Sequence, residues 1–222
     1  MREPPSGSAK RNLGTSCPLA FVLSTTRNLK RLHWDWHYES AFKHEFNQPF
    51  LDLEAICDDL APVRHSLKEL VIQADCTIDD GMAHPWLTVR SSPTKMMNFE
   101  FDHLEIPLPF LVTFNPANSI RLQDVVPRTI RRLVINLGLF PHISSDRFGG
   151  GGDVDVNEWD DESLFELIEV WMRSWPECYS ILSHVTVPLK SMSWDPNYAD
   201  TVGKEAKLRE LLLQHEVEVK IY

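Results

Sequence analysis

Five short stretches of this chain share one pattern, which constrains its fold more than any single residue does. Each has a large apolar residue, two variable residues, an aliphatic residue, one variable residue, and then an aliphatic or aromatic residue. The stretches occupy residues 29–34, 67–72, 101–106, 130–135 and 182–187. Repetition of a strand-like segment predicts a fold built from stacked units, and it sorts the side chains into a buried set and a displayed set.

The composition is that of one globular domain without a nucleic-acid or membrane partner. A chain of 222 residues can bury a continuous core unaided, and its formal net charge of −10 opposes phosphate binding, which needs a clustered basic surface. No apolar run approaches the roughly 20 residues that cross a bilayer. The four cysteines lack metal-ligand spacing and residues 1–10 lack an apolar signal core. We therefore expect an intracellular protein, cytoplasmic or nuclear, with reduced cysteines.

The chain divides into a tail, a domain and an insertion. Residues 1–16 are rich in Pro, Ser, Gly and Lys and predict a flexible N-terminal tail before a domain at 17–222. The glycine run at 149–152 and the acidic residues after it predict an insertion at about 146–162. Strands are predicted at 31–36, 69–73, 103–106, 131–136 and 184–187, with a closing strand at 217–221 because its apolar and charged residues alternate. Residues 79–94 are predicted to be mostly loop.

Helical spacing appears between these strands. Apolar residues at 50, 53, 57 and 60 predict a helix that ends before Pro62. Ser163 and Glu166 have capping-box spacing and predict the start of another helix, and a last helix is predicted around Leu208. The buried stripe of the second helix would consist of Leu164, Leu167, Ile168, Trp171 and Trp175. Strands separated by helices predict a mainly parallel sheet with outer helices, an α/β fold. A closed sheet and a doubly wound sheet are the remaining alternatives. A nucleotide-binding version of the latter is not indicated, because no glycine-rich turn follows a strand.

Strand alternation predicts which side chains the sheet displays. In spatial order, the first displayed column is Arg31, Glu69, His103, Arg132 and His184. The middle column is His33, Val71, Glu105, Val134 and Thr186. The third column is Asp35, Gln73, Pro107, Asn136 and Pro188. Charges of both signs mixed with Val and Pro suit a protein partner better than a phosphate or a metal ion. The predicted partner-binding residues are therefore Arg31, His33, Asp35, Glu69, Gln73, His103, Glu105, Arg132, Asn136 and His184.

The segments at 126–135 and 65–72 each have a polar turn followed by a leucine-framed strand. In this they resemble leucine-rich-repeat proteins, in particular the irregular repeat regions of fungal F-box-type proteins, and the resemblance covers about residues 25–190. It implies a solenoid arc whose concave strand face recognises a protein, in a role related to ubiquitin-ligase adaptors. Two features depart from the family. The turn positions after the strands hold His37, Asp75, Pro109, Gly138 and Lys190 in place of Asn or Cys, and no F-box pattern precedes Leu29.

Candidate chemistry is weak, and we predict no catalytic residue, metal or cofactor. His103 and His184 share a column, but Arg132 lies between them and separates their strands by about 9.6 Å. The segment that begins at Asp153 imitates a calcium loop, yet its twelfth position is Leu164 instead of a bidentate Glu. Neither a Gly-x-Ser-x-Gly elbow nor a phosphate-binding glycine loop is present.

The sequence therefore favours a non-catalytic protein-protein interaction module of unknown oligomeric state and unknown partner. Two alternatives remain. The first is a small α/β enzyme domain, which would need an enclosed pocket with converging polar groups of shifted pKa. The second is a non-functional fragment of a longer repeat protein, which would show an exposed apolar first repeat because repeat arrays need polar caps.

Overall fold

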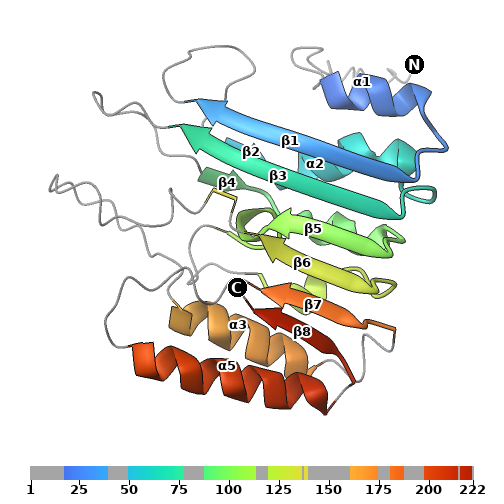
Figure 1. Cartoon of the computed structure of the whole chain (residues 1–222). Coiled ribbons are helices and arrows are strands. Elements are labelled where there is room, and N and C mark those ends of the chain that lie inside the picture. The colour runs from blue at the N-terminus through green and yellow to red at the C-terminus, as the bar shows by residue number, and fades with distance from the viewer. Residues whose placement is uncertain are drawn as a thin grey trace, which may run out of the picture.

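The computed structural model describes residues 18–39, 50–77, 88–113, 120–136, 138–139, 161–174, 181–187, 198–214 and 216–221. Within these ranges six strands pair in parallel and form one sheet in the order β1-β3-β5-β6-β7-β8 (Figure 1). The strands are β1 (Arg31–Glu39), β3 (Glu69–Thr77), β5 (His103–Pro107), β6 (Arg132–Asn136), β7 (His184–Val187) and β8 (Glu218–Ile221). Their order in space follows their order in the chain. The predicted α/β fold with a mainly parallel sheet is confirmed, and the sheet is open because β1 and β8 lie at opposite ends of it.

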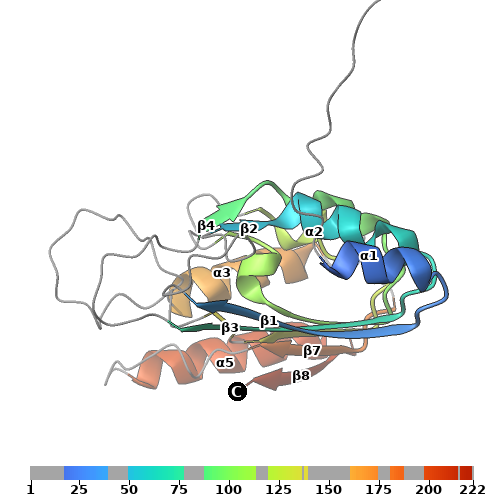
Figure 2. The same cartoon turned by 90° about the horizontal axis from the view of Figure 1, so that it is seen from above.

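The connections between the strands contain helices of two kinds. The α-helices are α1 (Pro18–Thr25), α2 (Leu53–Leu60), α3 (Asp161–Arg173) and α5 (Tyr198–Leu213). The 3-10 helices are η1 (Ala61–Val63), η2 (Pro93–Asn98), η3 (Leu108–Phe110) and η5 (Leu122–Asp124). In η1, η2 and η3 a proline occupies one of the first two positions, where its missing N–H costs nothing. Figure 2 shows α1, α2 and α3 on the same face of the six-stranded sheet.

The face of the sheet that the helices cover forms the core. Leu70, Leu104 and Leu133 stand side by side in register on β3, β5 and β6, and all are fully buried. Ile72, Ile106 and Ile135 repeat this burial two residues further along the same strands. Period-2 alternation sends these residues to one face. Complete burial of each such side chain contributes about 1.5–3 kcal/mol, so this face accounts for much of the stability of the domain.

One expectation for the region before β3 is wrong. Phe50 lies in a strand, β2 (Phe50–Asp52), and not on a helix, because β2 pairs in parallel with β4 (Thr88–Arg90). The helix starts afterwards, at Leu53, where the carboxylate of Asp52 accepts a hydrogen bond from the Ala55 amide at 3.1 Å and acts as the N-cap. The predicted loop at 79–94 contains β4 and the start of η2 among its described residues.

The helix predicted after the acidic segment is present as α3, but its start differs from the prediction. The helix spans Asp161–Arg173, so Ser163 lies inside it and is not the capping residue. The predicted apolar stripe holds for Leu164, Ile168 and Trp171, which are buried, while Trp175 lies outside the described residues. The predicted tail at 1–16 also lies outside them. So does the predicted insertion at about 146–162, except for residues 161 and 162 at the beginning of α3.

Candidate functional site

One face of the six-stranded sheet is left uncovered by the described helices and strands. Figure 1 looks directly onto this face, and no described helix or strand lies in front of it. Parallel sheets usually have both faces covered by crossover helices, so a bare face on such a sheet requires polar side chains. We call it the open face and define it by the side chains of Arg31, Glu69, His103, Arg132 and His184 and of the residues in line with them.

The strand register aligns the displayed residues into columns across the open face. The first column runs through Arg31, Glu69, His103, Arg132, His184 and Glu218. The middle column runs through His33, Val71, Glu105, Val134, Thr186 and Lys220. The third predicted column is divided, because the pairing of β3 with β5 ends at Val71 and Glu105. Asp35 stands beside Gln73, and Pro107 beside Asn136, while Pro188 lies outside the described residues.

Glu69 joins two strands at one end of the first column. Its Oε2 lies 3.2 Å from Arg31 Nε, and its Oε1 lies 3.1 Å from His33 Nε2. The hydrogen bond with His33, aided by the charge of Arg31, holds the pKa of Glu69 below its usual value. Glu69 is therefore an ionised anchor that fixes the two side chains of β1, and Arg31 and His33 remain mostly exposed above it.

His103 occupies the middle of the first column. Burial, together with the positive charge of Arg132, lowers the pKa of the His103 imidazole, so the ring is neutral at physiological pH. Its Nε2 atom is buried and makes no hydrogen bond with the described residues. Arg132 is exposed beside it. This place on the open face thus offers a neutral imidazole edge next to a guanidinium.

His184 stands in a short hydrogen-bonded chain. Its Nδ1 lies 2.7 Å from Ser183 Oγ, and its Nε2 lies 2.9 Å from Glu218 Oε2. The order Ser–His–Glu imitates that of a hydrolase triad, but the surroundings do not support that chemistry. The backbone amides of Ser183 and His184 both donate to the Arg131 carbonyl, at 2.9 and 3.1 Å, which leaves neither free to stabilise an oxyanion. His184 and Glu218 are also 50% and 75% exposed, so water screens the site.

The middle column has an apolar centre. Val71, Val134 and Thr186 are only 6%, 8% and 9% exposed, although no described helix or strand covers them. Glu105, half-buried, lies between the two valines. An apolar line bordered by charged and imidazole groups has the layout of a protein-binding surface, with a dry centre and a polar rim.

Asn136 has a structural role that the sequence did not indicate. Its Nδ2 donates to the Ile72 carbonyl of β3 at 3.0 Å, and its Oδ1 accepts from the Gly138 amide at 3.0 Å. A side chain from β6 thereby reaches β3 where the pairing of β3 with β5 has already ended. A Cβ on Gly138 would lie 2.6 Å from the Ala74 carbonyl oxygen, so the turn needs glycine there. Asp35 and Gln73, by contrast, are exposed. Among the described partner-binding residues that the sequence predicted, Asn136 is the one whose Nδ2 and Oδ1 both bond to backbone groups.

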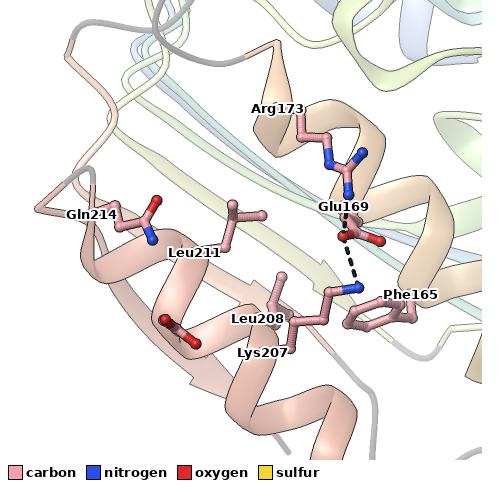
Figure 3. A pocket seen from close by; sticks show the side chains of 8 residues that line it. Phe165, Glu169, Arg173, Lys207, Leu208, Leu211 and Gln214 are labelled. Carbon is pink, nitrogen blue, oxygen red and sulfur yellow. Dashed lines mark hydrogen bonds and ion pairs between the residues drawn. The ribbon is translucent and has the colours of Figure 1, made fainter.

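A hollow of about 210 Å³ lies between α3 and α5 (Figure 3). Glu169 is its central polar group and contacts Lys207 Nζ at 2.9 Å and Arg173 Nη2 at 2.8 Å. The hydrogen bond with Lys207, joined by that with Arg173, lowers the pKa of Glu169. Lys207 also lies over the Phe165 ring, 5.1 Å from its centroid. These contacts make Glu169 an ionised clamp between two helices and a poor general base.

No cluster of three or more His, Cys, Asp or Glu side chains in the described part of the chain is arranged to hold a metal ion. No helix within the described ranges combines the length and the apolar character that crossing a bilayer requires. Cys57 is buried on α2, as predicted, and burial raises the pKa of its thiol to about 12, which makes it unreactive.

Comparisons with protein-family models, curated proteins and solved structures found no match. Sequence reasoning missed Ser183, Glu218 and Lys220 as members or neighbours of the open face. The alternation of the closing strand contained the signal for two of them, because Glu218 and Lys220 alternate with Val217, Val219 and Ile221.

Proposed function

We propose that this chain is a non-catalytic protein-binding module that recognises its partner through the open face. The single observation that carries the proposal is that the described helices cover one face of the parallel sheet and leave exposed polar residues on the other (Figure 1). These exposed residues include Arg31, His33, Asp35, Gln73 and Arg132. Sequential strand order with helices on one face also supports a leucine-rich-repeat-like arc, since each strand then adds one row to a continuous surface.

The chemistry of the open face favours a protein over other ligands. In the first column Arg31 stands beside Glu69, and Arg132 and Glu218 flank His184. Charges of both signs therefore mix along this described column, whereas a nucleic acid or a membrane surface is attracted by a patch of one sign. Val71 and Val134, which are 6% and 8% exposed, form an apolar line between these charged residues. Mixed charge around an apolar line selects a partner by complementary pairs and gives specificity more than raw affinity.

The resemblance to the repeat regions of fungal F-box-type proteins adds a more specific form of this proposal. The partner would be a protein delivered to a ubiquitin ligase, with this chain as the recognition region, in the cytoplasm or nucleus. Ubiquitination of a captured partner that depends on this chain would support that form. Binding without ubiquitination would leave the general proposal standing and overturn the specific one.

The test exchanges two charges near the centre of the open face. Glu105→Arg combined with Arg132→Glu keeps the net charge and reverses the pattern around Val71 and Val134. The wild-type chain and this variant would be used for affinity capture from a lysate of the source cells, with mass spectrometry as the readout. We expect the variant to lose specific partners that the wild-type chain retains, because each reversed contact becomes a like-charge contact.

A matched control carries the same kind of exchange away from the open face. Arg121 and Asp124 form an exposed ion pair on η5, 2.9 Å apart, and Arg121→Asp with Asp124→Arg keeps that pair and the net charge. The control should capture the same partners as the wild-type chain. An identical set of captured proteins for the folded open-face variant would contradict the proposal.

A further inference from the structure

Strand β1 is an edge strand whose outer side has no neighbour within the described part of the chain. It lies at the end of the sheet and pairs along all nine of its residues with β3. The Lys30 carbonyl accepts hydrogen bonds from the Lys68 and Glu69 amides at 2.8 and 3.0 Å, so even-numbered residues direct their backbone groups toward β3. The odd-numbered residues of β1 therefore present their N–H and C=O groups at the free edge.

The sequence of β1 is nearly palindromic. It reads Arg-Leu-His-Trp-Asp-Trp-His-Tyr-Glu, with Asp35 at its centre. Tryptophan occupies both positions next to Asp35, and histidine occupies both of the next positions outward, at 33 and 37. Leu32 and Tyr38 follow, and the ends carry opposite charges, Arg31 and Glu39. A sequence that is the same in both directions around one residue is suited to pairing with itself in antiparallel orientation.

We propose that two copies of this chain pair through β1, antiparallel and about a twofold axis at Asp35, so that their sheets join into one. The partner is a second copy because antiparallel pairing about Asp35 places each β1 residue opposite a residue of matching or complementary character in the other chain. Arg31 of each copy stands opposite Glu39 of the other, which places opposite charges at both ends of the seam. Position 33 stands opposite position 37 in the same way.

The backbone geometry fits this register. The odd-numbered residues, whose polar groups face the free edge, would form the hydrogen-bonded pairs, each of which exchanges two backbone bonds. Trp34 and Trp36 would then meet across the seam at non-hydrogen-bonded pairs, where side chains approach most closely. Both tryptophans are only partly buried in the single chain, so a second strand beside them removes apolar surface from water.

Helix α1 supplies further apolar surface at the same edge. Figures 1 and 2 place it along the N-terminal part of β1 and beyond the free edge, on the face that carries α2. It bears Phe21 and Val22, which are 72% and 52% exposed. A second copy of β1 would run beside this helix. The exposed Phe21 and Val22 side chains thus add apolar surface that a second copy would cover.

The opposite edge of the sheet differs in each of these respects. Strand β8 has four residues and carries Glu218 and Lys220, charges that protect a short edge from pairing. Self-association through β1 therefore closes as a dimer and does not grow into a filament. This self-association involves the edge of the sheet, so it does not depend on whether a partner binds the open face.

Charge exchange at the two ends of β1 tests the register. The oligomeric state of the full chain would be measured by analytical ultracentrifugation over a range of concentrations. Arg31→Glu alone and Glu39→Arg alone each place like charges at both ends of the seam, and each should weaken the dimer on the order of tenfold. The double variant should restore the wild-type dissociation constant. An equimolar mixture of the two single variants should form a heterodimer, because opposite charges then face each other again.

Asp35→Asn gives a second measurement, in which the expected change is a tighter dimer and not a weaker one. Asp35 meets its own copy at the twofold axis, and removal of this like-charge contact should tighten the dimer several-fold. Circular dichroism would confirm that the variants fold, and Glu69→Gln controls for the loss of the Arg31–Glu69 ion pair within one chain. Monomers at every concentration for both the wild-type chain and Asp35→Asn would overturn the proposal. So would a dimer whose dissociation constant does not respond to the Arg31 and Glu39 charges.

Discussion

The two faces of the six-stranded sheet use the same strands for different purposes. On the covered face the side chains in register are nearly interchangeable, as with Leu70, Leu104 and Leu133, and each is fully buried. On the open face each strand contributes a different group, as with Glu69, His103 and Arg132 in the adjacent column. Uniform apolar chemistry specifies how the units stack, while varied polar chemistry carries the information that can distinguish partners.

The largest expected effect contrasts neighbours on β5. Leu104→Ala leaves a cavity in the covered face and should lower the free energy of unfolding by about 2–5 kcal/mol. Glu105→Ala, one residue further on and on the open face, should change it by less than about 0.5 kcal/mol. Urea unfolding monitored by circular dichroism measures both. Equal losses for the two variants would contradict the division between the faces.

A smaller loss of unfolding free energy is expected at Asn136. This comparison distinguishes a polar residue with a structural role from polar residues that are only displayed. Asn136→Ala leaves the Ile72 carbonyl and the Gly138 amide without their partner and should cost about 1–3 kcal/mol. Gln73→Ala, an exposed change on β3, serves as the control and should be nearly neutral. Thermal unfolding of the two variants checks this. A neutral result at Asn136 would return that residue to the set available for binding.

The smallest expected effect on the free energy of unfolding is at Glu69, and it depends on pH. Its pKa is lower in the folded protein than the ordinary value of 4.5, so its carboxylate stabilises the fold fully above that value. The contribution is lost as the pH falls through the folded-state pKa. Glu69→Gln should therefore destabilise the protein by less than about 1 kcal/mol at neutral pH, and the difference should vanish in strong acid. Urea unfolding of both chains at the two pH values measures it, and a difference that does not change with pH would contradict the ion-pair assignment.

Local pattern was sufficient to predict the sheet. The alternation around Leu32, Leu70, Leu104, Leu133 and Val185 fixed which side chains face the core, and the register then aligned the displayed residues into the predicted columns. This worked because period-2 alternation is a property of the strand itself and needs no knowledge of distant contacts.

The features that sequence did not predict depend on distant contacts. Strand β2 has three residues, and only its pairing with β4 stops Phe50 from continuing the helical stripe. The role of Asn136 arises because β3 extends beyond the end of its pairing with β5, which is a matter of relative strand length. The chain formed by Ser183, His184 and Glu218 joins the start of β7 to β8, and neither segment alone contains a sign of it.

Recognition of a partner through the open face is tested most directly by a photoreactive amino acid placed at one position on each side of the sheet. Glu105 lies on the open face, and Val170 on α3 is 54% exposed on the helical side. Each labelled chain would be irradiated in lysate of the source cells, and the crosslinked proteins would be identified by mass spectrometry. The account predicts a specific crosslinked partner from position 105 and none in common from position 170. The same partner from position 170 alone would show that the protein binds through its helices and would contradict recognition by the open face.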